Sequence, residues 1–146
     1  VCGEPHAHIG VDGCGAPVHA MPLIALARAF RSIATGAAGP TGNRIHEAMT
    51  THPAMVGGER RDVTRLMRAV PGLMAKDGAD GVYALAMPDG RALAIKIGDG
   101  GERVRPAVLL AALEALGVDV AAVEQQMQVP VLGHGQPVGA IRSLVP

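Results

Sequence analysis

Aromatic side chains are almost absent from this chain of 146 residues, which has one Phe, one Tyr and no Trp. Nucleic-acid-binding proteins usually stack bases on aromatic rings and carry an excess of positive charge. Here 13 basic residues balance 13 acidic residues. Both absences argue against a nucleic-acid partner. Any hydrophobic core must be filled mainly by Ala, Val, Leu, Ile and the seven Met of a chain that is 49% hydrophobic.

Cysteines and long apolar runs are also scarce. Cys2 and Cys14 are too few for a disulfide framework and fit a reducing compartment, although their spacing is compatible with one bridge. No apolar run approaches the ~20 residues of a membrane span, and the first residues do not show a charged region followed by an apolar stretch. We therefore expect a cytoplasmic protein without a membrane segment. The length suits one domain, and a start at Val1 instead of Met leads us to expect part of a longer polypeptide.

Helical spacing of apolar residues predicts three helices in the first half of the chain. Pro22 suits a first helical turn and Gly36 a C-terminal cap, and one apolar face lies between them: Leu23, Leu26, Ala27, Phe30, Ile33 and Ala34. Residues 37–42 are expected to form a loop. A second helix, stopped by Pro53, is predicted by four residues at the i, i+3, i+4, i+7 spacing: Ile45, Ala48, Met49 and His52. Asp62 is expected to cap the third.

Beyond residue 72 the period changes to that of strands. An apolar run at 73–75 precedes two alternating segments, 82–88 and 91–97, which flank the tight-turn signal Asp89-Gly90 and predict an antiparallel meander. Further elements are expected in this order: a helix at about 103–116, a shorter helix at about 119–127, and two short strands around Gly133-His134-Gly135. Helices, a meander and a covering helix together predict an α+β fold.

Lys76 stands at the end of the first strand segment, before Asp77 and Gly78. Two interpretations are open. Edge strands commonly carry Lys, because a charge there blocks aggregation. Alternatively, Gly78 lets a ligand lie against the backbone while a desolvated amine moves protons or supports an alkoxide nucleophile. Lys96, within an alternating strand, is expected on the solvent face.

A second candidate site is the turn that runs from Asp12 to Gly15. It presents an acid and the Cys14 thiol together, which suits a metal ligand or a nucleophile. The alternative is a buried structural cysteine. The neighbouring Cys and His residues contain no Cys-x-x-Cys pair, so a structural zinc site of their own is not expected.

Three stretches of the sequence resemble one family over nearly the whole chain. They are "VDGCGAPVHAMPLIALARAFR", the segment from "THPAMVGGERRD" to "AIKIGDG", and "PVLGHGQPVGAIR". Their Asp-Gly-Cys-Gly turn, Gly-Gly-x-x-Arg-Asp helix start and Lys-x-Gly-Ala-x-Gly bend come in the order typical of the asparaginase II family, the Rhizobium-type L-asparaginases. The resemblance implies the fold of serine β-lactamases and penicillin-binding proteins.

The resemblance also implies roles for particular residues. Lys76 would be catalytic, on the strand where β-lactamases carry Lys-Thr-Gly, and Gly78 would permit close approach of the substrate. Asp77, on the substrate side, stands where Thr or Ser is commoner. Cys14 would bind zinc, and Asp12 would lie beside the metal or the substrate.

The activity implied is hydrolysis of L-asparagine to L-aspartate and ammonia by serine/lysine acyl transfer. The family's Ser-x-x-Lys nucleophile and its Cys-x-x-Lys zinc ligands precede the Asp-Gly-Cys turn, and neither motif occurs here. Residues 1–146 are therefore expected to be the C-terminal portion of the enzyme, inactive alone, and to form a homodimer or pair with the N-terminal part. Two alternatives are a β-lactam- or peptide-binding relative of the same fold and a non-catalytic fragment that oligomerises.

Overall fold

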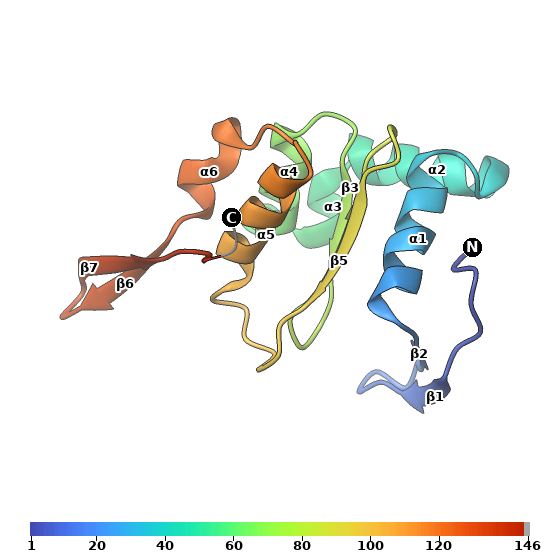
Figure 1. Ribbon diagram of the computed structural model, residues 1–146, viewed down its shortest axis with the longest axis horizontal. Helices are drawn as coiled ribbons and strands as arrows, with labels where there is room; N and C mark the ends of the chain where they lie inside the picture. The colour runs from blue at the N-terminus through green and yellow to red at the C-terminus, as the bar shows by residue number, and fades with distance from the viewer. Residues whose placement is uncertain (145–146) are drawn as a thin grey trace.

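A computed structural model describes residues 1–144, and in that range the chain is an α+β protein (Figure 1). Its centre is a three-stranded antiparallel sheet in the order β3-β4-β5. These strands are β3 (Met74–Asp77), β4 (Val82–Ala86) and β5 (Ala92–Lys96). The predicted α+β class and the predicted meander are both confirmed, while the serine β-lactamase-like arrangement stays a prediction.

The turn between β4 and β5 has the geometry that Asp89-Gly90 predicts. Gly90 has a φ of 94°, in the region that favours glycine, and its amide donates to the carbonyl of Met87 at 3.0 Å. The Met87 amide in turn donates to the carbonyl of Arg91 at 2.8 Å. The meander is therefore closed by a local turn, which fixes the register of the two strands.

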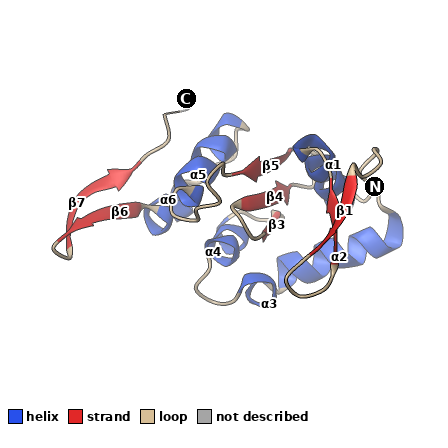
Figure 2. Cartoon of the chain, turned by 90° about the horizontal axis from the view of Figure 1, so that it is seen from below, coloured by secondary structure: helices blue, strands red, loops and turns tan. Residues whose placement is uncertain are grey.

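Helices cover both faces of the central sheet (Figure 2). On one face, α4 (Asp62–Ala69) and α5 (Arg105–Ala115) share a buried core with the sheet. Fully buried members of this core include Val63, Leu66, Tyr83, Leu85, Leu109 and Leu113. The other face packs against α1 (Leu23–Ala34), which contacts β4 and β5. Small side chains dominate that second contact, with Ala25, Ala27 and Ala34 buried on the helix.

The start of α2 (Gly39–Thr51) corrects one expectation. Residues 39–42, predicted to be a loop, form the first turn of this helix, because Pro40 has a fixed φ that suits a helix start. Similarly, Pro53 stops α2 as predicted but also begins the short helix α3 (Pro53–Gly57), which the sequence pattern did not indicate. The stripe predicted to be apolar on α2 is partly exposed at Ile45.

The expected cap of α4 is wrong. Arg61 occupies the N-cap position, and Asp62 is the first helical residue. The Asp62 carboxylate accepts a hydrogen bond from the neighbouring amide of Val63 at 2.9 Å and is also engaged by Arg105. An ion pair with a distant helix has therefore taken the place of the capping hydrogen bond.

Two separate hairpins extend from the two ends of the molecule (Figure 1). The first consists of β1 (His8–Val11) and β2 (Pro17–Ala20), and the second of β6 (Val129–Gly133) and β7 (Gln136–Ile141). The second was predicted and follows α6 (Ala121–Met127). Nearly all residues of these hairpins are exposed or half-buried. Among residues 1–144, no helix is long and apolar enough to cross a membrane.

Candidate active site

Lys76 lies near the end of β3, and 47% of its side chain is exposed. Its Nζ donates one hydrogen bond to the backbone carbonyl of Asp77 and another to Asp77 Oδ1, both at 2.6 Å. The amine is thus accessible to solvent yet tethered to the next residue of the strand. The Lys76 amine therefore has defined hydrogen-bond partners, unlike a lysine that only projects into solvent from the edge of a sheet.

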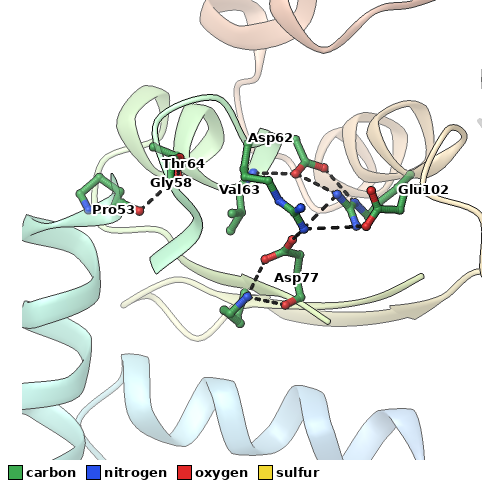
Figure 3. A network of polar contacts seen from close by, with 10 residues as sticks. Pro53, Gly58, Asp62, Val63, Thr64, Asp77 and Glu102 are labelled. Carbon is green, nitrogen blue, oxygen red and sulfur yellow. Dashed lines mark hydrogen bonds and ion pairs between the residues drawn. The ribbon is translucent and has the colours of Figure 1, made fainter. Parts of the chain in front are cut away.

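Asp77 is the buried member of the pair, with only 2% of its side chain exposed. Figure 3 shows Asp77 within a network of polar contacts. Its Oδ2 accepts a hydrogen bond from Arg61 Nη2, on the side opposite Lys76. Burial by itself would raise the pKa of this carboxyl group, but the hydrogen bonds from Lys76 and Arg61 outweigh it and lower the pKa to about 2. Asp77 is therefore ionised under ordinary conditions and binds two cations.

Arg105 continues the network into helix α5. Its Nε and Nη2 donate to the two carboxylate oxygens of Asp62 at 2.9 and 3.0 Å, which is a bidentate ion pair. Arg105 Nη1 lies 3.4 Å from Glu102 Oε1, and Arg105 Nη2 lies 4.0 Å from Asp77 Oδ2. Three cations therefore meet three carboxylates in what we call the charged cluster: Lys76, Arg61, Arg105, Asp62, Asp77 and Glu102.

Tyr83, on β4, packs against the charged cluster. It is fully buried, and the guanidinium carbon of Arg105 lies 5.7 Å from the centre of its ring. Burial, followed by the charges of Asp62 and Asp77, raises the pKa of Tyr83, so the phenol stays neutral. Its hydroxyl group has no hydrogen-bond partner among residues 1–144.

Reasoning from sequence found part of the charged cluster and missed the rest. The Gly-Gly-x-x-Arg-Asp motif that ends in Arg61 and Asp62 was noticed, but no role followed from it. Arg105 gave no signal, because its partner Asp62 lies 43 positions away and no local spacing relates the two.

The turn from Asp12 to Gly15 joins β1 and β2. Cys14 Sγ donates to Asp12 Oδ2 at 3.4 Å, and the Gly13 amide donates to Asp12 Oδ1 at 2.8 Å. Cys14 is exposed, so the buried structural cysteine weighed as an alternative is wrong. In the described part of the chain, the hydrogen bonds of this turn remain within the hairpin. Among residues 1–144, no hydrogen bond or ion pair joins Asp12 or Cys14 to Lys76, whose amine binds Asp77.

A zinc ion requires at least three protein ligands with suitable geometry. Within residues 1–144, no group of three His, Cys, Asp or Glu side chains could hold a metal ion. Cys14 and Asp12 supply two neighbouring donors, and the His6 and His19 rings contact each other with their centroids 5.3 Å apart. These donors do not form a zinc site by themselves.

The fold and the charged cluster define an α+β protein with a tethered lysine amine near the end of β3, an edge strand of the central sheet. The family model described as L-asparaginase II matches residues 1–143. The chain therefore belongs to the L-asparaginase II family, which supports an amidohydrolase role with asparagine as the substrate. No curated protein matches the chain.

Proposed function

We propose that this chain supplies the catalytic lysine of an active site that hydrolyses L-asparagine to L-aspartate and ammonia. The observation that carries this proposal is the position of Lys76. Its amine is tethered near the end of β3 and half-exposed, and Gly78, which has no side chain, stands two residues further on. Membership of the L-asparaginase II family supports the choice of substrate.

The proposed reaction is acyl transfer. A serine hydroxyl group is too weakly acidic to attack an amide unaided, so a neutral amine must accept its proton. The serine oxygen then bonds to the carbonyl carbon of the asparagine side chain. The carbon–nitrogen bond breaks, and ammonia leaves with a proton returned by the amine. Water cleaves the resulting ester, which releases aspartate and restores the serine.

Lys76 would accept the proton or stabilise the charge beside the group that does. Neither of the chain's serines, Ser32 and Ser143, is followed by Lys three residues later. We therefore propose that the nucleophile comes from polypeptide outside residues 1–146, within a serine β-lactamase-like fold. A homodimer, or pairing with an N-terminal part, would complete the site.

The remaining predicted residues have different support. Gly78 stands two residues after Lys76, and a role in close approach of the substrate remains proposed for it. Asp12 and Cys14 stay proposed as a substrate-side acid and a zinc ligand, and both roles need additional groups beside the exposed hairpin turn. A direct contact between Asp77 and the substrate has less support, because its carboxylate is buried and already binds Lys76 and Arg61.

The test is replacement of Lys76 in the complete protein, with release of ammonia from asparagine as the readout. Lys76→Met should lower kcat by about 10²- to 10⁴-fold, the usual contribution of an acid–base group. Lys96→Met is the matched control, because Lys96 is also exposed on the central sheet and bonds to backbone carbonyls. It should retain activity.

Equal turnover by the two lysine variants would overturn the proposal, provided circular dichroism shows both to be folded. Glutamine and a chromogenic cephalosporin should be assayed beside asparagine. Preferential hydrolysis of the cephalosporin would favour the β-lactam-binding alternative.

A further inference from the structure

The Gly-Gly-x-x-Arg-Asp motif has a packing reason. Gly57 ends α3 where the first turn of α4 passes, and a Cβ atom there would lie 2.4 Å from Val63 Cγ1. Gly58 has a φ of 86°, which disfavours any residue with a side chain. The buried Thr64 hydroxyl group lies 2.7 Å from the Gly58 carbonyl oxygen and 3.2 Å from that of Pro53. The turn is therefore fixed from both sides.

This turn places Arg61 within reach of the central sheet. Arg61 stands at the N-cap of α4, and its guanidinium group reaches Asp77 Oδ2. The pairing of β3 with β4 explains how Arg61 and Lys76 can both reach Asp77. Asp77 pairs with Tyr83 and shares the face covered by α4 and α5, whereas Lys76 pairs with Ala84 on the opposite face, against which α1 packs. Arg61 and Lys76 thus bind one carboxylate from its two sides.

We propose that Arg61 is a positioning residue that sets how firmly Asp77 holds the Lys76 amine. The inference depends on the proposed function, because it gives Lys76 a part in the reaction. Arg61 neutralises Asp77 from the helix side, so Lys76 is not the carboxylate's only close cation. Its amine can therefore leave Asp77 and give up a proton during the reaction.

Other charged groups near the Asp77 carboxylate also affect its electrostatic environment. Arg105 Nη2 is 4.0 Å from Asp77 Oδ2, too far for a short hydrogen bond, and is itself bound to Asp62. Glu102 lies 3.8 Å from Arg61 but is mostly exposed. The neutral phenol ring of Tyr83 packs against Arg105. Without Arg61, Lys76 would be the only cation hydrogen-bonded to Asp77, and the carboxylate would hold its amine more firmly.

The first test uses the chain as it stands and needs no enzymatic activity. The titration of the Asp77 carboxyl carbon is followed by NMR in Arg61→Gln and in Arg60→Gln, whose target is the adjacent exposed arginine. Loss of a hydrogen-bonded cation should raise the Asp77 midpoint by about one pH unit in Arg61→Gln. Arg60→Gln should leave it unchanged. Equal midpoints in the two variants overturn the inference, whatever the chain's activity toward asparagine.

Arg61→Lys is the conservative variant. It should restore part of the wild-type behaviour, and it replaces Arg61→Gln as the test if Arg61→Gln does not fold. Its single ammonium group keeps the charge but offers fewer donors, so its midpoint should fall between those of the wild type and Arg61→Gln. If Arg61→Gln does not fold, a midpoint for Arg61→Lys no higher than that for Arg60→Gln overturns the inference.

The second test uses the complete protein and measures the pH profile of ammonia release. Arg61→Gln should move the rise of kcat to higher pH and leave KM nearly unchanged, because Asp77 would then hold the Lys76 amine more firmly. A purely structural role would lower kcat equally at every pH, and that result would overturn the inference. Arg61→Lys should restore most of the profile.

Discussion

The central sheet and the two hairpins use the same kinds of apolar residue with opposite results. On the sheet, Leu85 and Tyr83 are fully buried beneath α4 and α5. On the hairpins, Val11 is 80% exposed and Val138 is 69% exposed. A two-stranded hairpin is marginally stable alone, whereas a third strand and a packed helix provide the missing burial. Alternating apolar residues therefore specify strands, but only a covering layer makes a core.

The candidate residues divide along the same line. Lys76 and Asp77 belong to the central sheet, where helices from distant parts of the chain hold their partners in place. Asp12 and Cys14 belong to the first hairpin, where hydrogen bonds within the turn hold them. The geometry at Lys76 is consequently a property of the packed fold, and the geometry at the turn is local.

The largest effect should come from breaking the buried ion pair of the centre. Arg105→Met would leave the Asp62 carboxylate without its bidentate partner, and we expect a loss of about 3–5 kcal/mol in the free energy of unfolding. Arg103→Met is the control, because Arg103 is exposed two residues earlier. It should change stability by less than about 0.5 kcal/mol. Urea denaturation measures the free energy of unfolding of both variants. Similar losses in the two would mean that the charged cluster does not stabilise the fold.

A smaller but still clear effect should separate the core from a hairpin directly. Leu113→Ala removes a fully buried side chain, and we expect a loss of about 3 kcal/mol. Val138→Ala, on the exposed second hairpin, should cost no more than about 0.5 kcal/mol. The measurement is again the free energy of unfolding in urea. A large loss in Val138→Ala would mean that the hairpin is covered in solution, which would break the comparison.

The elements that local patterns specify were predictable from sequence. The 3.6-residue period placed α1, and Asp89-Gly90 placed the β4–β5 turn. Errors arose where one residue type serves two purposes. Pro40 and Pro53 begin helices, although proline also ends them, and Asp62 has the side chain of a cap but pairs with Arg105.

The candidate site was predictable only in part, for a physical reason. Lys76 and Gly78 attract notice because a charge and a glycine at a strand end are locally unusual. The partners that hold Asp77 come from two helices, and long-range ion pairs leave no periodicity in a sequence. Arg61 illustrates the limit: its motif was visible, yet its contact with Asp77 depends on the packing of Gly57 against Val63.

The smallest expected effect is a change with pH in how much Asp77 stabilises the fold. Its pKa of about 2 lies below the ordinary value for Asp, so its contribution is complete above about pH 4 and is lost as the pH falls toward 2. That contribution should be about 2 kcal/mol at neutral pH, after allowance for screening at the half-exposed Lys76 and Arg61.

Asp77→Asn removes this titration, so the stability difference between the wild type and Asp77→Asn should be largest between pH 5 and pH 7. It should shrink steadily between about pH 4 and pH 2 in urea denaturation series. Asp80→Asn changes an exposed aspartate on the same bend and should show no such convergence. A difference that stays constant with pH would mean that Asp77 is not the ionised anchor of the charged cluster. The tether on Lys76 would then have to come from the backbone carbonyl alone.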